Sequence, residues 1–224
     1  MKRKKSKKRV KRSSNIALLL FLIVFSFVLI DQFLQMKVEE KAISFLPNPV
    51  AEDVQKYTPI LQRELEEVNL EEYTFVLAAI MQQESKGKGG DPMQASESAG
   101  LPPNSIKDPE QSIKQGVKHF KRALNYGNKK NVDFPTVIQA YNMGIGYIDF
   151  VASQGGKHSE EIAKKFSLAQ AEKNPQVYNC GGDKNNFRYP YCYGDFTYTT
   201  KVTKNIESLT VSNSGKIPKD LLDI

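Results

Sequence analysis

The sequence has 224 residues and a formal net charge of +7, from 32 basic and 25 acidic residues. That length suits one ordinary domain with an appendage. Nine of the basic residues fall in residues 1–12, which leaves 23 basic and 25 acidic residues in the rest of the chain. This distribution argues against a nucleic-acid-binding domain, whose basic excess would lie on its folded part.

The first predicted element is a membrane anchor. Directly after the basic run, Ile16 to Ile30 contains one polar residue, Ser26. As a helix these fifteen residues span about 22 Å, which is less than the hydrocarbon core of about 30 Å, but Phe33 and Leu34 lengthen the apolar run. Basic flanks remain in the cytoplasm, so we expect the remainder of the chain to lie outside the cell.

A cleaved signal peptide is the alternative interpretation of this segment. A cleavage site needs small residues just past the apolar run, and Ala42 and Ser44 lie too far downstream. The sequence therefore favours an uncleaved, single-pass anchor. We divide the chain into a cytoplasmic basic tail (1–14), a transmembrane signal-anchor (15–34), a polar stalk (35–57), one globular domain (58–209) and a C-terminal tail (210–224).

Residues 58–209 show helical spacing and no sustained strand alternation, so we predict a mainly α-helical single domain. The first helix is predicted within residues 57–68, with Thr58 as its cap and Pro59 at its first position. The second covers residues 70–85, where apolar residues occupy a broad side.

Four more helices follow in chain order. Residues 107–124 begin a helix at an Asp108 cap, residues 133–144 run from an Asp133 cap to a stop at Gly144, and residues 156–173 have Ser159 as cap. Residues 194–209 are rich in threonine, as strands often are, but their apolar residues keep helical spacing. We therefore predict a closing helix there.

Two cysteines, Cys180 and Cys192, lie in the part of the chain expected outside the cell. An oxidising compartment permits a disulfide between them, and closing a loop of this length contributes about 3 kcal/mol in the chain-entropy model. Two unpaired thiols are the alternative. A metal site is not expected, because His119 and His158 have no companion ligand at a metal-binding spacing.

Glu84 lies at the C-terminal end of the second predicted helix, on or beside its buried side. Burial and the negative end of the helix dipole both disfavour a charged carboxylate, so both raise its pKa. A carboxylic acid that is still protonated near neutral pH can protonate a leaving glycosidic oxygen. The spacing alone also fits a solvated residue at a fraying helix end.

Asp91 follows seven residues later in the glycine-rich stretch "GKGGDPMQ". A tight reversal there would bring it across a cleft from Glu84, where it would act as a base on water or stabilise positive charge on the sugar ring. The alternative is a turn residue before Pro92, since Asp-Pro commonly starts turns.

Four segments occur in the order of the motifs of the goose-type lysozyme and soluble lytic transglycosylase superfamily. They are "AAIMQQES", "DPMQASESAG", "VIQAYNMGIG" and "DFTYTTKV". The wording "MQASES" and "YGDFTY" most resembles the lysozyme-like domain of Gram-positive cell-wall muramidases. The resemblance covers about residues 58–208 and implies a lysozyme-like catalytic domain.

Matched residue by residue, the resemblance makes Glu84 the catalytic acid and Asp91 a proposed second carboxylate of the muramidase branch. It also implies six further site residues. Ser85 would support the acid, and Met93 and Gln94 would line the sugar cleft. Tyr141 and Asn142 form the Tyr-Asn pair, in which Asn142 would donate to a substrate acetamido group. Tyr198 would bring its hydroxyl to the acid.

Two departures from the family pattern matter. The Gly-Leu-Met-Gln turn appears here as residues 91–94, "DPMQ", so its chemistry differs. The two-headed members carry a cysteine peptidase domain after this one, whereas this sequence ends at Ile224, so we expect it to cut glycan only.

The resemblance predicts a peptidoglycan glycosidase without cofactor or metal, an N-acetylmuramidase that cleaves the β-1,4 bond between N-acetylmuramic acid and N-acetylglucosamine. The alternatives are a lytic transglycosylase that releases 1,6-anhydromuramyl products, a non-catalytic wall-binding protein, and an anchored adaptor recognised through its basic tail. Expected partners are glycan strands and the membrane. The sequence does not indicate the oligomeric state.

Overall fold

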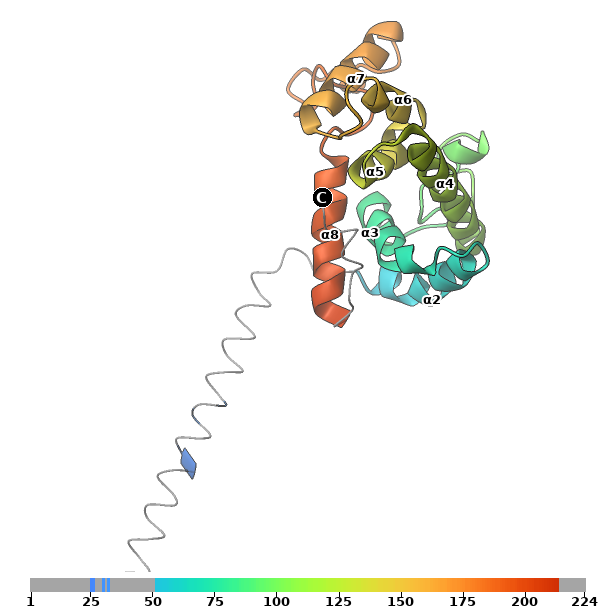
Figure 1. The fold of residues 1–224 in the computed structure, drawn as a ribbon, viewed down its shortest axis with the longest axis vertical. Coiled ribbons are helices and arrows are strands. Elements are labelled where there is room, and N and C mark those ends of the chain that lie inside the picture. The colour runs from blue at the N-terminus through green and yellow to red at the C-terminus, as the bar shows by residue number, and fades with distance from the viewer. Residues whose placement is uncertain (1–24, 27–29, 31, 33–50, 214–224) are drawn as a thin grey trace, which may run out of the picture. The chain divides into compact units, whose positions relative to one another are not determined.

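The computed structural model describes residues 51–213, together with Phe25, Ser26, Ile30 and Gln32. Within residues 51–213 the secondary structure consists of α-helices and short 3₁₀ turns, without a strand (Figure 1). The prediction of a mainly helical domain is confirmed.

Helix α3 (Thr74–Glu84) is the central element of the domain. Its sequence, "TFVLAAIMQQE", is apolar on every side rather than along one stripe, and residues on all its sides are buried. Helices α2 (Glu52–Glu66) and α8 (Tyr198–Asn213) pack against it, as Figure 1 shows. The buried core therefore leads directly to Glu84 at the end of α3.

The predicted start of the first helix was wrong. Helix α2 begins at Glu52, so Pro59 lies inside the helix and Thr58 is not its cap. The Thr58 hydroxyl donates to the Val54 carbonyl instead. Val54 is fully buried against the core, and this burial draws residues 52–57, which were assigned to the stalk, into the helix.

Helices α4 (Pro109–Lys130) and α5 (Phe134–Met143) start where their caps predict. The Asp108 carboxylate accepts from the Glu110 N–H, and the Asp133 carboxylate accepts from the Thr136 N–H. The stop at Gly144 is also confirmed, with φ of 77° in the region that favours glycine. Helix α4 is longer than predicted, since its apolar stripe continues through Leu124 to Gly127.

Helix α7 (Glu160–Lys173) begins after the predicted Ser159 cap, whose hydroxyl accepts from the Ile162 N–H. The threonine-rich closing segment is helical in α8, as predicted, and extends to Asn213. Sequence analysis missed the short helix α6 (Gly146–Ala152), which packs between α5 and α7.

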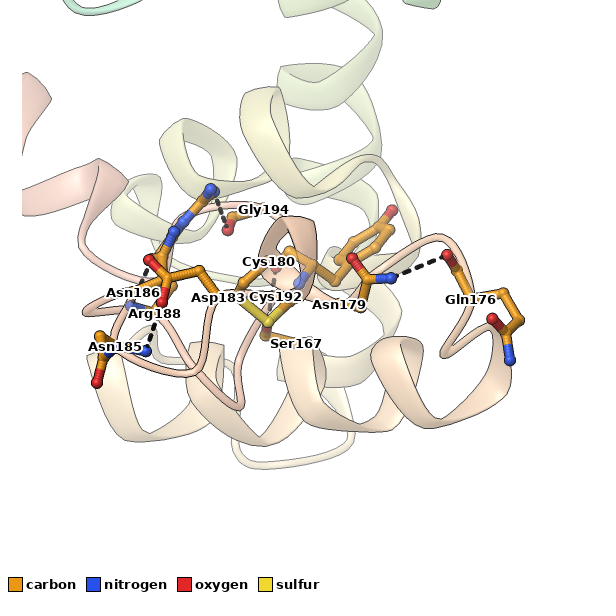
Figure 2. Close-up of a disulfide and its surroundings, with 11 residues drawn as sticks. Ser167, Gln176, Asn179, Cys180, Asp183, Asn185, Asn186, Arg188, Cys192 and Gly194 are labelled. Carbon is orange, nitrogen blue, oxygen red and sulfur yellow. Dashed lines mark hydrogen bonds between the residues drawn. A yellow bond between two sulfur atoms is a disulfide. The ribbon is translucent and has the colours of Figure 1, made fainter.

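A disulfide joins Cys180 to Cys192 and closes the segment between α7 and α8. Cys180 begins the short 3₁₀ turn η3 (Cys180–Gly182). Figure 2 shows the bridge with nearby hydrogen bonds, among them the one from the Arg188 guanidinium to the Gly194 carbonyl. The bridge and these bonds hold a segment that has little regular structure.

The predicted anchor, residues 15–34, lies outside the described residues apart from Phe25, Ser26, Ile30 and Gln32. Among the residues that the structure describes, no helix combines the length and apolar character needed to cross a membrane.

Candidate active site

Glu84 lies on the wall of a cavity of about 410 Å³. Its helix ends there because the next residues reverse the chain, with Lys86 and Gly87 at φ of 58° and 76°. The cavity is lined by Glu84, Gln94, Glu97, Ser98, His119, Arg122, Tyr141, Asn142, Gly144 and Tyr193. The 3₁₀ turn η2 (Glu97–Ala99) and helices α3, α4 and α5 therefore meet at this site.

The pKa of the Glu84 carboxyl group is raised from 4.5 to about 7. Burial is the main cause, and the nearby negative charges of Asp91, Asp195 and Glu97 raise it further, while a hydrogen bond from Tyr198 lowers it. A group with this pKa is protonated in a substantial fraction of molecules at neutral pH. Glu84 can therefore donate a proton into the cavity.

The Tyr198 hydroxyl donates to Oε1 of Glu84 at 2.5 Å. Tyr198 begins α8, is 2% exposed, and has a pKa well above its usual value because of burial and the charge of Glu84. Its hydroxyl thus stays protonated and acts as a fixed donor. The two residues are 114 positions apart in sequence, and the packing of α8 against α3 brings them together.

Asp91 is buried and does not line the cavity. It is 3% exposed, and its two carboxylate oxygens accept four hydrogen bonds. The donors are the N–H groups of Ala95 and Ser96 and the hydroxyls of Ser96 and Ser112. Burial raises the pKa of Asp91, but these bonds lower it more, so the carboxyl group stays ionised.

A carboxylate offers about four lone-pair positions, and all of them are used here. Asp91 has none left to orient a water molecule, and it does not line the cavity. Its hydrogen bonds stabilise the turn at 91–96, which agrees with the alternative interpretation of Asp91 as a turn residue.

Ser85 precedes this turn, and Met93 and Gln94 lie within it. The Ser85 hydroxyl donates to the Pro92 carbonyl at 2.7 Å and so ties the end of α3 to the turn. Met93 is fully buried against Gly116, where an added Cβ would lie 2.9 Å from its side chain. Of the three, Gln94 lines the cavity, with its amide nitrogen donating to the Asp91 carbonyl and to Asn104.

Tyr141 and Asn142 reach the cavity from α5. The Tyr141 hydroxyl donates to the Met93 carbonyl and so links α5 to the turn at 91–96. Asn142 Oδ1 accepts from the Asp195 N–H at 2.7 Å, which orients the side chain. Its Nδ2 has no hydrogen-bond partner among the described residues and is available to a ligand carbonyl.

Sequence reasoning did not assign Glu97, Ser98, His119, Arg122, Gly144 or Tyr193 to the cavity. Burial lowers the pKa of His119, and its neutral ring donates from Nε2 to the Tyr141 carbonyl. His119 and Arg122 are three positions apart on one face of α4, which is a helical signal. Glu97 lies within the quoted "MQASES" motif, but nothing in its spacing marks it.

No metal or cofactor was expected at this site. Among the residues that the structure describes, no group of three or more histidine, cysteine, aspartate or glutamate side chains is arranged to hold a metal ion.

A family model described as lysozyme-like matches residues 51–206. The chain is 46% identical to the "uncharacterized membrane protein YocA" of Bacillus subtilis (strain 168), over 91% of this chain and 92% of that protein. It is also 40% identical to the bifunctional muramidase/DL-endopeptidase CwlT of that strain, over 55% of this chain and 37% of CwlT.

A solved structure shares the fold. It is a crystal structure from Staphylococcus aureus subsp. aureus Mu50, described as similar to a lipoprotein of the NLP/P60 family. Its TM-score is 0.61 at 37% sequence identity, over 71% of this chain and 54% of that chain. The present chain thus spans about a third of CwlT and about half of the Staphylococcus protein.

Proposed function

Because the chain belongs to the lysozyme-like family, we propose that it is a glycosidase that cuts the glycan strands of peptidoglycan. More specifically, we propose an N-acetylmuramidase that cleaves the β-1,4 bond between N-acetylmuramic acid and N-acetylglucosamine. The observation that carries the proposal is Glu84, a carboxyl group with a pKa of about 7 on the wall of a cavity. The name of CwlT, which includes a muramidase activity, supports the choice of substrate.

In this mechanism Glu84 is the general acid. It transfers its proton to the glycosidic oxygen as the bond from that oxygen to the anomeric carbon breaks. Tyr198 holds the carboxyl group in place and stabilises the carboxylate that results. The free amide hydrogens of Asn142 suit the carbonyl of a substrate acetamido group.

A lytic transglycosylase remains the second candidate, and one observation favours it. The saturated hydrogen bonding of Asp91 removes the carboxylate that was expected to activate water. A transglycosylase does not use water, because the 6-hydroxyl of the muramyl residue attacks instead. A wall-binding protein without turnover is the third candidate, and the raised pKa of Glu84 argues against it, since binding alone needs no proton donor.

The proposed location is the cell membrane, with residues 15–34 as a single-pass anchor and the domain facing the wall. The relative YocA is named as a membrane protein and matches most of this chain, which supports this proposal. An extracellular domain would have direct access to peptidoglycan.

The decisive test is digestion of purified peptidoglycan by the full-length protein, with mass spectrometry of the fragments. We expect wild-type protein to release disaccharide fragments that end in reducing muramic acid. Glu84→Gln keeps the shape but removes the proton, and general acids typically contribute about 10²–10⁴-fold to rate. A Gln variant that is folded by circular dichroism and cuts at the wild-type rate would refute the proposal.

A further inference from the structure

The cavity that holds Glu84 contains a second carboxylate that sequence reasoning passed over. Glu97 is the first residue of the 3₁₀ turn η2 and lines the same cavity as Glu84. It is exposed, and among the described residues its carboxylate has no hydrogen-bond or ion-pair partner. Its lone pairs are therefore available to a water molecule.

Glu97 and Glu84 line the same cavity, and the charge of Glu97 has a small influence on the pKa of Glu84. Burial is the main cause of the raised pKa of Glu84, and the charge of Glu97 is one of the smaller causes. Asp195, which also acts on Glu84, is paired with Lys201 and does not line the cavity. Of the two unassigned carboxylates near Glu84, Glu97 alone faces the cavity.

The bonds of Asp91 explain how Glu97 is held. Asp91 accepts from the N–H groups of Ala95 and Ser96, the two residues that lead directly into η2. The Ser98 hydroxyl then donates to the Ala95 carbonyl and accepts from Gln115 of α4. Asp91 thus fixes the turn that presents Glu97, although it does not face the cavity itself.

We propose that Glu97 is the general base that activates the attacking water and that Asp91 is the residue that positions Glu97. This inference rests on the proposed hydrolysis. Glu97 takes one proton from water while the water oxygen bonds to the anomeric carbon. The bond from that carbon to the glycosidic oxygen breaks, and the oxygen keeps the electron pair and takes the proton of Glu84. Exchange with solvent then returns a proton to Glu84 and removes one from Glu97.

The first experiment compares Glu97→Gln with a matched control, Glu71→Gln, in the full-length protein. Glu71 is also exposed and also begins a 3₁₀ turn, η1 (Glu71–Tyr73), but it lies outside the cavity. We expect Glu97→Gln to lower kcat by about 10²-fold or more with a similar KM, and Glu71→Gln to match wild type. Wild-type kcat for a folded Glu97→Gln would overturn the inference.

Chemical rescue separates a base from a positioning residue. Azide is a small nucleophile that needs no base, so it should restore glycan cleavage by Glu97→Ala and yield a glycosyl azide that mass spectrometry detects. It should not restore Asp91→Ala, whose defect lies in the shape of the turn. Rescue of Asp91→Ala, but not of Glu97→Ala, would overturn the assignment of both residues.

The two proposals fail in distinguishable ways. If Glu84→Gln retains full activity, the proposed function fails whatever Glu97 does. If wild-type fragments are anhydromuramyl sugars, about 18 mass units lighter, the reaction is transglycosylation and Glu97 has no water to activate. If the fragments end in reducing muramic acid but Glu97→Gln is fully active, only the inference on Glu97 fails.

Discussion

The pKa of the Glu84 carboxyl group is set by influences that act in opposite directions. Burial and neighbouring negative charges favour its neutral form, whereas the bond from Tyr198 favours the carboxylate. The balance leaves its pKa at about 7. One buried carboxyl group at the end of an apolar helix can therefore serve as an acid near neutral pH.

We predict that kcat/KM falls as pH rises through about 7, because Glu84 must be protonated in the free enzyme. Removing the Tyr198 hydroxyl removes the influence that lowers the pKa of Glu84, so Tyr198→Phe should move this basic limb to higher pH. The pH profile of fragment release measures both. A limb that stays in place in the Phe variant would show that Tyr198 does not act through Glu84.

Glu84 and Tyr198 were predicted as site residues because each belongs to one of the four motifs, and the structure joins them by a hydrogen bond. Glu97 escaped prediction because an exposed glutamate in a loop is the ordinary state of a glutamate. Its position in the cavity depends on the bonds of Asp91 to residues four and five positions further along the chain. A turn of this kind produces no periodic spacing of apolar residues, so the sequence pattern could not predict it.

Capping residues predicted the starts of three helices correctly, whereas a proline led to a wrong start for α2. Asp108, Asp133 and Ser159 all cap helices through bonds to nearby N–H groups, which are local and so visible in sequence. Pro59 suggested a helix start, but burial of Val54 extends α2 towards the N-terminus past it. Tertiary packing outweighed a local preference there.

The disulfide is predicted to stabilise the domain more than it affects catalysis. The bridge closes a loop with a sequence separation of 12, worth about 3 kcal/mol in the chain-entropy model. Tyr193, which follows Cys192 and lines the cavity, is also held by Ser167 and by the Met143 carbonyl. The double variant Cys180→Ser, Cys192→Ser should therefore unfold at lower urea concentration but still cut peptidoglycan.

Wild-type protein treated with reductant is the control for this comparison, and it should lose the same stability, whereas the double variant should not respond. If the double variant is as stable as the oxidised protein, the bridge is not a stabilising element. If alkylation without reductant adds two groups to natively exported protein, the thiols are unpaired there.

Across the whole molecule, the site depends on contacts between distant parts of the sequence. Glu84 meets Tyr198 across 114 positions, Tyr141 meets Met93 across 48, and Asn142 meets Asp195 across 53. The motif order indicated that these segments belong together, but it did not indicate which side chains support the turn and which remain available to a ligand. The structure turns the Tyr141 hydroxyl towards the backbone of the turn and leaves the Asn142 amide hydrogens for a ligand.

The proposed topology makes a prediction for the intact cell. Nine basic residues before the apolar run favour a cytoplasmic N-terminus, and a disulfide in the domain fits an oxidising compartment outside. Protease added to protoplasts should therefore remove the domain and leave a small membrane-bound fragment that contains residues 15–34. Permeabilised protoplasts are the control, because protease should then also digest the basic tail. A mature chain that begins near Phe45 and is free in the medium would contradict the anchor, since the apolar segment would then have been a cleaved signal peptide.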